Sequence, residues 1–256
     1  YEKTGQNDKA AAEYETIAAN NAASDPALAR EALWSASDLY GKAGRDDEAL
    51  RILRRYIAAY PKPVDVNMEA VNRLYTHYSK AGNAAESQLW LKALSDGYDR
   101  AGTNNTARTR YLGAMAKYTL NQPQYDAFAA IPLTQPLKKS LGVKKAAMQK
   151  TLEAYQRVAA IGVAEFTTAA NYQVAEIYRK FAADLMASER PKGLSELELE
   201  QYGFLLEEQA TPFEDKALGL YTANANLAKQ AIYDESVRKS FAALAKLSPG
   251  RYNKHE

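Results

Sequence analysis

Apolar side chains recur every three or four residues along most of this chain, which is the spacing of one buried face of an α-helix. In the first such segment, 8–20, the residues on one face are Ala11, Tyr14, Ile17 and Ala18. The same spacing predicts further short helices over 26–42, 46–60, 64–80, 85–98 and 106–120. Because short connectors join these segments, consecutive helices are expected to pack as antiparallel pairs.

Residue types at the ends of these segments support the predicted boundaries. Asp25 directly precedes Pro26. The Asp25 side chain can cap the next helix, and Pro26 suits its first turn because proline has no N–H that needs a partner. Gly44 supplies the following turn, and Pro61 and Pro63 end the helix after it. The same order returns with a turn at Gly82. The first part of the chain is therefore predicted to be a run of helical hairpins.

The pattern changes in the second half of the chain. Pro123 and Pro132 interrupt the segment 121–136, where we expect only a short or irregular helix. Longer helices are then predicted over 137–161, 163–188, 195–209, 212–233 and 235–247.

Two of these longer helices have recognisable start signals. Ser195 is followed three residues later by Glu198, which is the spacing of a capping box. Thr211 and Pro212, with Glu214 in the first turn, repeat the signal. A helix boundary is therefore predicted just ahead of Pro212.

Two of the predicted hairpins carry similar residues at matching positions. The first hairpin has Tyr40, Gly44, Ala49, Leu53 and Pro61, and the second has Leu74, Tyr78, Gly82 and Leu91. This pattern resembles the tetratricopeptide repeat. The second copy departs from it at Ser87, where Ala is usual, and at Asp99, where Pro is usual. The turn glycines Gly44 and Gly82 are 38 residues apart, longer than the usual spacing of about 34.

The expected fold is all-α. Abundant Ala, sparse Gly and Pro, and scattered Val and Ile favour helix over strand. The resemblance implies that residues 1–120 form tetratricopeptide-like helical hairpins of an α-solenoid. The solenoid is expected to continue into longer helices in residues 121–256, which form a C-terminal module packed on it.

The same resemblance implies a binding groove. In the family, fixed positions on the first helix of each hairpin line a concave surface that accepts a peptide or helix. Carried over by position, the groove residues are Glu31, Trp34, Asp38, Lys42, Asn72, Thr76 and Lys80. Trp34 is either the anchor of this groove, since large aromatic side chains dominate binding energy, or a packing residue against the preceding helices. Members that hold a C-terminal carboxylate use Lys, Asn and Arg, so Glu31 and Asp38 disfavour that partner.

A second resemblance covers roughly the last hundred residues. The stretches that carry it are 167–178, 188–191, 197–202, 207–210, 212–217 and 233–247. They are similar to the C-terminal part of large tetratricopeptide proteins of Gram-negative cell envelopes, often associated with TonB/ExbB/ExbD-type or gliding-type machinery. This implies a periplasmic or outer-membrane-associated scaffold whose partners are envelope proteins or peptides. No catalytic residues come with the resemblance.

Charge and composition exclude several functions. Lys and Arg number 33 against 31 acidic residues, and a net charge of +2 gives no field that favours nucleic acid. No cysteine is present, which removes disulfides and thiolate chemistry. The longest apolar runs are too short to span a bilayer. Because the chain begins at Tyr1 rather than Met and has no signal-like start, we expect an excised piece of a longer protein.

Candidate metal and cofactor chemistry is sparse. The two histidines, His77 and His255, have no second His or convergent carboxylates at metal-ligand spacing. Phosphate-cradling glycine loops, dinucleotide fingerprints and nucleophile elbows are also missing from the sequence. We therefore expect neither a metal nor a cofactor, and a protein that is not an enzyme.

Two alternatives to an envelope scaffold remain open. One is an enzyme or accessory domain for cell-wall polymer that uses carboxylates of the acidic helix: Glu196, Glu198, Glu207 and Glu208. It requires two of them to converge in a cleft, with one buried. The other is a cytosolic peptide-binding adaptor.

A run of lysines marks the helix predicted over 137–161. Its members are Lys138, Lys139, Lys144, Lys145 and Lys150, beside an apolar face of Leu141, Met148, Leu152, Tyr155 and Ala159. We interpret it as a core helix with a charged outer face. Contact with an anionic membrane or an acidic partner is the alternative.

Overall fold

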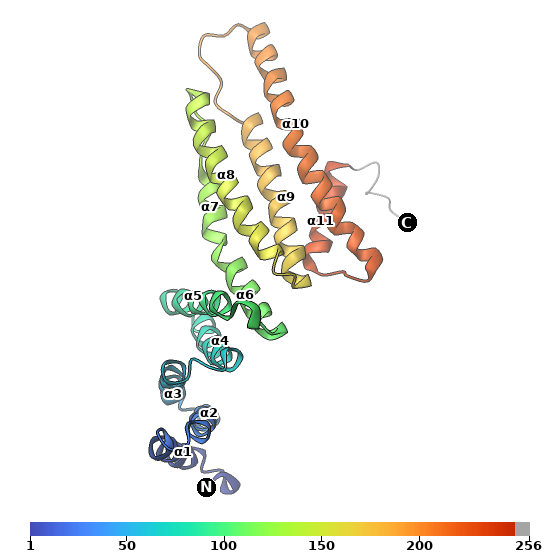
Figure 1. Ribbon diagram of the computed structural model, residues 1–256. Helices are drawn as coiled ribbons and strands as arrows, with labels where there is room; N and C mark the ends of the chain where they lie inside the picture. The colour runs from blue at the N-terminus through green and yellow to red at the C-terminus, as the bar shows by residue number, and fades with distance from the viewer. Residues whose placement is uncertain (249–256) are drawn as a thin grey trace. The chain divides into compact units, whose positions relative to one another are not determined.

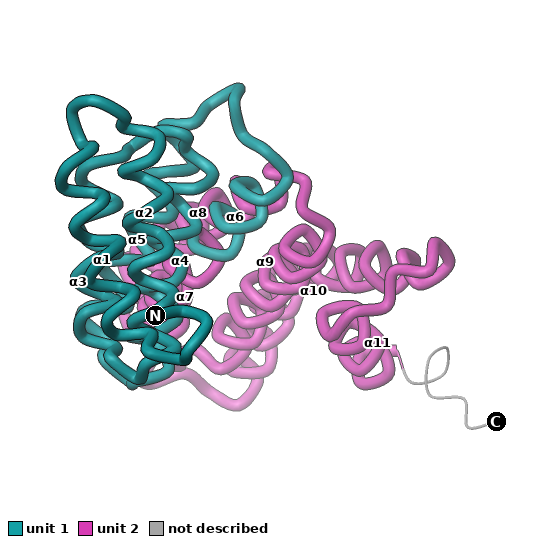
Figure 2. The backbone as a smooth tube through the Cα atoms, turned by 90° about the horizontal axis from the view of Figure 1, so that it is seen from below, with its two compact units in different colours: residues 1–116 teal, residues 117–256 magenta. Residues whose placement is uncertain are grey.

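The computed structural model describes residues 1–248 of the chain. They form two compact units, residues 1–116 (unit 1) and the described residues from 117 onward (unit 2), coloured separately in Figure 2. Within the described residues every regular element is a helix and none is a strand, so the predicted all-α fold is confirmed. No helix of the described chain is long and apolar enough to cross a membrane.

Unit 1 is a run of short helices in which α1 to α5 pack each on the next, as Figure 1 shows. The helices are α1 (Asn7–Asn21), α2 (Pro26–Lys42), α3 (Asp46–Ala59), α4 (Val64–Lys80), α5 (Ala84–Ala101) and α6 (Ala107–Leu120), with the 3-10 turns η1 (Glu2–Thr4) and η2 (Gly102–Asn104). The boundary between the units falls inside α6. Unit 1 therefore has the solenoid-like hairpin arrangement expected for it.

Local signals explain where these helices start and turn. The Asp25 side chain accepts a hydrogen bond from the Leu28 amide at 3.0 Å, and Asn83 does the same for Glu86 at 3.1 Å. At the hairpin turns, Gly44 and Gly82 have φ of 71° and 69°, in the left-handed region that glycine adopts without strain. The predicted limits of α2 and α4 are confirmed to the residue.

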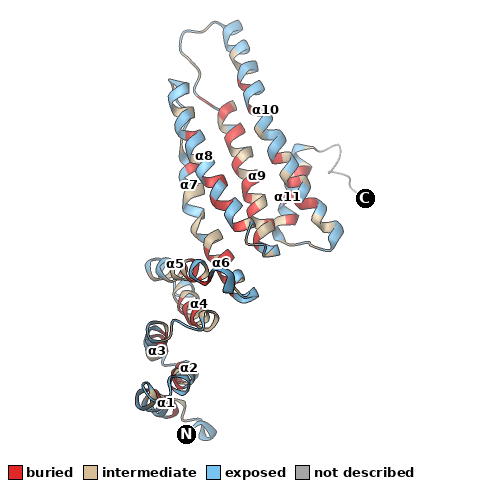
Figure 3. Cartoon of the chain, in the orientation of Figure 1, coloured by how far each residue is buried: buried red, intermediate tan, exposed pale blue. Residues whose placement is uncertain are grey.

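Small residues let the helices of unit 1 approach closely. Ala11 of α1 and Ala29, Ala32 and Ala36 of α2 are fully or almost fully buried. Larger apolar side chains, such as Ile52, fill the remaining core, and each such burial stabilises by about 1.5–3 kcal/mol. Figure 3 colours the buried positions of unit 1 red among exposed positions in pale blue.

Unit 2 is built around one central helix. Its elements are the end of α6, α7 (Gln122–Ala130), α8 (Leu137–Ala159), α9 (Ala164–Met186), α10 (Glu196–Asn226), the 3-10 turn η3 (Leu227–Gln230) and α11 (Glu235–Leu247). Helix α9 packs against α7, α8, α10 and α11, and Figure 3 shows buried residues along much of its length. The short helix expected between residues 121 and 136 is α7, and α8, α9 and α11 follow close to their predicted bounds.

The predicted helix boundary at Pro212 is wrong, because α10 runs without interruption from Glu196 to Asn226. Pro212 lies on the exposed side of the helix, where its ring meets solvent. The neighbouring Thr211 hydroxyl donates to the carbonyl oxygen of Glu207 at 2.8 Å. Phe213 packs edge-on against Phe181 of α9, with ring centroids 4.6 Å apart. Packing on α9 outweighs the lost backbone hydrogen bond, so the start signal at Thr211 is not used.

One of the five lysines of α8 lies inside the protein, which corrects the prediction that these charges face outward. Lys144 is fully buried, and its ammonium donates to the carbonyl oxygens of Phe128 at 3.2 Å and Ile131 at 2.6 Å. It also lies 2.7 Å from a carboxylate oxygen of Asp184 in α9. Carbonyls at the C-terminal end of a helix lack partners within the helix, and here Lys144 supplies one for the end of α7.

Candidate functional site

Trp34 lies beside hollows on the surface of unit 1. Its half-buried indole ring stands edge-on to Tyr56 of α3, with centroids 5.5 Å apart. The guanidinium carbon of Arg73 in α4 lies 4.0 Å from the indole centroid, within cation–π range. Both neighbours belong to helices that follow α2 in sequence. The ring is thus held at the junction of α2, α3 and α4.

Two adjoining hollows share Trp34 and Val66. The larger, about 420 Å³, is lined by Arg30, Glu31, Trp34, Ser35, Tyr56 and Val66. The smaller, about 240 Å³, is lined by Trp34, Asp65, Val66, Glu69 and Arg108. Together they make a surface, here called the Trp34 groove, with lining residues from α2, α3, α4 and α6. Its floor is aromatic and aliphatic and its walls are charged, which is typical of ligand-binding surfaces.

Ion pairs fix the helices that carry this groove. Arg73 of α4 pairs with Asp38 of α2 while it stacks on Trp34. Arg108 of α6 makes two hydrogen bonds of 2.9 Å to Glu69 of α4. The Arg108 guanidinium holds the pKa of the Glu69 carboxyl below its usual value, against the opposing effect of burial. These pairs tie α2 to α4 and α4 to α6, so the hollow is preformed.

The structure separates the seven predicted groove residues into three groups. Glu31 and Trp34 line the larger hollow. Asp38 is paired with Arg73, so it holds a wall of the groove, and Asn72 is half-buried in α4 and lines neither hollow. Lys42 and Lys80 are exposed and Thr76 is half-buried, and these three line neither of the two hollows.

Several groove residues were missed by the sequence reasoning. Glu69 occupies the position of Glu31 one repeat later, since the two are 38 residues apart like the turn glycines. The repeat spacing in the sequence could therefore have identified Glu69 as a groove residue. Arg73, Arg108 and Tyr56 carry no positional signal, because their role depends on which helices meet. The pairing of Asp38 also changes the argument about carboxylate partners, because its charge is already neutralised.

The second tryptophan has a different environment. The indole N–H of Trp90 donates to Glu86 at 2.9 Å, and the same carboxylate pairs with Arg54 at 3.1 Å. Arg54 also donates to the Tyr78 hydroxyl at 2.7 Å. By contrast, among residues 1–248 the indole N–H of Trp34 has no hydrogen-bond partner. Trp90 is satisfied within the fold, whereas Trp34 keeps a free donor at a hollow.

The carboxylates invoked for an enzyme do not form a cleft. Glu196, Glu198, Glu207 and Glu208 are all solvent-exposed along α10. Glu198 closes the predicted capping box, since it accepts from the Ser195 amide at 2.8 Å. The convergence and burial that this alternative requires are therefore missing for these four residues.

Of the two histidines, one lies within the described residues. His77 is half-buried in α4, with its ring edge-on to Tyr78 at a centroid distance of 5.3 Å. His255 lies outside the described residues. Between residues 1 and 248 no three His, Asp or Glu side chains are grouped to hold a metal ion.

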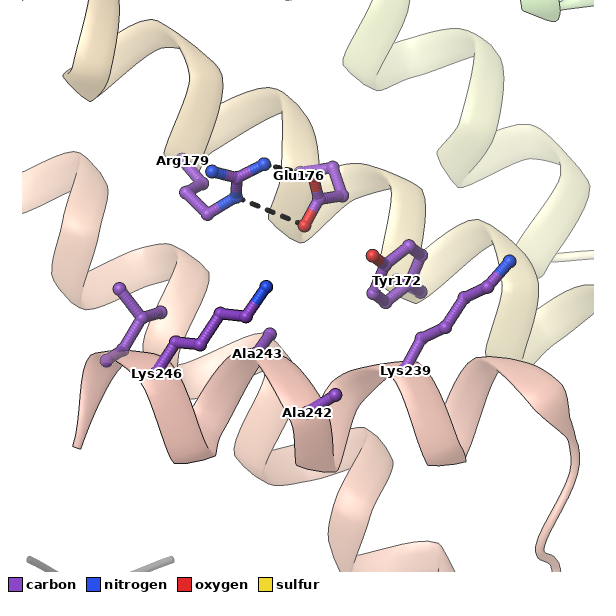
Figure 4. A pocket seen from close by; sticks show the side chains of 8 residues that line it. Tyr172, Glu176, Arg179, Lys239, Ala242, Ala243 and Lys246 are labelled. Carbon is purple, nitrogen blue, oxygen red and sulfur yellow. Dashed lines mark hydrogen bonds and ion pairs between the residues drawn. The ribbon is translucent and has the colours of Figure 1, made fainter. Parts of the chain in front are cut away.

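Unit 2 contains a separate pocket of about 240 Å³ between α9 and α11, shown in Figure 4. It is lined by Tyr172, Glu176, Arg179, Lys239, Ala242, Ala243, Lys246 and Leu247. Sequence reasoning did not single out these residues as a group, because the pocket depends on the packing of two helices that are distant in sequence.

Comparison of the chain with protein-family models, with curated proteins and with solved structures gave no match. The resemblance to tetratricopeptide proteins therefore stays a prediction based on residues such as Tyr40, Gly44 and Pro61. The functional argument depends on the geometry of the two sites themselves.

Proposed function

We propose that unit 1 is a non-catalytic protein-interaction module that binds a peptide or helix of a partner protein in the Trp34 groove. The observation that carries the proposal is the state of Trp34: a half-buried ring beside a hollow of about 420 Å³, with an indole N–H that nothing in the described chain accepts. Tryptophan in a partly desolvated pocket is among the strongest anchors of protein interfaces.

The lining of the groove indicates what kind of segment fits. Tyr56 and Val66 with Trp34 offer an apolar seat for one aliphatic or aromatic side chain. The free indole N–H suits a backbone carbonyl of the bound segment. Arg30 and Glu31 stand at the larger hollow, and Asp65 stands at the smaller one. A peptide with an apolar anchor and flanking polar residues matches this surface.

The wider role proposed is that of a scaffold in the cell envelope of a Gram-negative bacterium, in the periplasm or at the outer membrane. Its support is the sequence resemblance of the last hundred residues to envelope repeat proteins. A cytosolic adaptor would use the same groove, so the location is tested separately, by the compartment in which the tagged full-length protein is found.

The test of the groove compares the two tryptophans. Peptides selected from a displayed library against the whole chain should shift the indole N–H signal of Trp34 in an NMR spectrum and leave that of Trp90 in place. Trp34→Ala should weaken their binding by about 30-fold or more, which corresponds to a hot spot of at least about 2 kcal/mol. Trp90→Ala is the matched control and should change the affinity by less than about threefold.

Two results would count against the proposal. One is a set of selected peptides whose affinity is unchanged by Trp34→Ala although the variant is folded. The other is a shift of the Trp90 signal instead, which would place the binding surface on the α3–α5 side of unit 1.

A further inference from the structure

The pocket between α9 and α11 is formed by two facing stripes of side chains. Tyr172, Glu176 and Arg179 follow one face of α9 at spacings of four and three residues. Lys239, Ala242, Ala243 and Lys246 follow the facing side of α11 at spacings of three, one and three. The two alanines leave the space that larger side chains would fill, and the result is a hollow of about 240 Å³.

The single carboxylate of this pocket is already saturated. Glu176 accepts two hydrogen bonds from Arg179, at 2.6 and 3.2 Å, and a short one from the Tyr221 hydroxyl. Burial raises the pKa of Glu176, but the hydrogen bonds from Arg179 and Tyr221 together lower it by more. The net pKa is below the usual value, so the carboxyl is ionised at neutral pH. Its charge is matched by Arg179.

The remaining charges of the pocket are positive. Lys239 lies 3.7 Å from Glu235, which is itself held by two hydrogen bonds from Arg238 at 2.8 and 2.6 Å. Lys246 has no ion-pair partner within residues 1–248. Figure 4 shows the Lys246 side chain extending from α11 toward the Arg179–Glu176 pair, with Lys239 beside Tyr172. Three cations against one anion leave the lining with a net charge of +2.

From this geometry we propose that the α9–α11 pocket binds a small organic anion, a phosphate or carboxylate group carried on a short apolar body. The anionic group pairs with Lys246, at the end of the hollow where Arg179 is already fixed by Glu176, while Lys239 at the Tyr172 end adds to the positive field. The apolar part lies on the methyl groups of Ala242 and Ala243 and against the Tyr172 ring. The volume, below that of most drug-sized sites, limits the ligand to a few heavy atoms beyond its anionic group.

The experiment uses the whole 256-residue chain and two probes, phenyl phosphate and benzoate, followed by NMR. Binding of either probe should shift amide signals of α9 and α11, and the better probe identifies the preferred anionic group. Lys246→Glu should weaken binding roughly tenfold or more because it replaces attraction by repulsion. Ala242→Leu, at an exposed position, should abolish binding by filling the hollow without a change of charge.

Lys150→Glu is the matched control, since it makes the same charge change on the exposed face of α8. It should alter the affinity by less than about twofold. Equal weakening by Lys150→Glu and Lys246→Glu, persistence of binding in a folded Ala242→Leu variant, or no shift with either probe at millimolar concentration would each overturn the proposal. Trp34→Ala should leave probe binding unchanged, so the outcome is independent of the proposed peptide groove.

Discussion

The two units hold their helices together by different means. In unit 1 the polar links join side chains that are roughly one repeat apart, such as Asp38 with Arg73 and Glu69 with Arg108, separated by 35 and 39 residues. They lie at the surface and are half exposed. Unit 2 has exposed local pairs as well, but some of its polar links are buried and span longer stretches. Asn224, for example, donates to the carbonyl oxygen of Thr168 at 2.9 Å across 56 residues.

This difference indicates how each unit serves a binding function. Because the polar links of unit 1 lie at the surface, side chains such as Trp34 remain beside open hollows. In a repeat fold these surface side chains can be substituted without loss of the core. Buried links are far more sensitive, since an unpaired polar group inside a protein costs more than a surface ion pair contributes. Unit 2 is therefore expected to tolerate substitution of its polar residues much less than unit 1.

The largest effect is expected from Asp184→Ala in unit 2. It leaves the buried ammonium of Lys144 without its carboxylate, and breaking such a pair from one side costs about 3–5 kcal/mol. Lys144→Met, which removes the charge itself, should cost less, about 1–3 kcal/mol for the two carbonyls that lose a partner. Urea unfolding followed by circular dichroism measures both. Equal, small losses would contradict the contrast between the units.

An intermediate loss of stability is expected from Gly113→Ala in unit 1. The cause here is a steric clash between helices and not the loss of a charge pair. A Cβ at Gly113 of α6 would lie 2.4 Å from Cγ and 2.5 Å from Cβ of Tyr98 in α5, so the helices must move apart. The expected loss is about 1–3 kcal/mol. Gly97→Ala is the matched control, because its Cβ meets the flexible Met68 side chain at 3.0 Å. It should change stability by less than about 1 kcal/mol.

Tryptophan fluorescence is the appropriate measurement for these glycine variants. Both tryptophans of the chain, Trp34 and Trp90, belong to unit 1, so their emission reports on this unit. A Gly113→Ala transition as stable as that of Gly97→Ala would show that the α5–α6 contact is looser than described.

The smallest effect is expected from Arg51→Ala, which removes the surface pair with Glu15, 2.7 Å apart. The loss should be below about 1 kcal/mol and should shrink with added salt. Burial raises the pKa of Glu15, but hydrogen bonds from Arg51 and Tyr40 lower it below its usual 4.5.

The sign of the pH dependence follows from this lowered pKa. A carboxyl with a depressed folded-state pKa stabilises above its unfolded pKa, and this contribution is lost as pH falls through the folded value. The difference between the parent chain and Arg51→Ala should therefore be present at neutral pH and vanish as pH falls through the lowered folded-state pKa of Glu15. A difference that persists in acid would mean that Arg51 stabilises by packing.

Helix position was the most predictable property of this chain. The apolar spacing of α2 and α4, the cap at Asp25 and the turn at Gly44 are local features, and the structure has them where they were expected. Pro212 shows the limit of such signals, since packing of Phe213 on α9 carries the helix through it. Lys144 shows a second limit. It was predicted to face outward because it is a lysine, but it is fully buried.

The sequence by itself determined the all-α class and the succession of hairpins followed by longer helices, because caps, turns and apolar spacing act within a few residues. Only the tertiary structure decided which side chains meet: Arg73 on Trp34, Lys144 at the end of α7, and Lys246 opposite Arg179. These contacts join residues far apart in the chain, and their geometry depends on how whole helices pack. Both candidate sites are products of that packing.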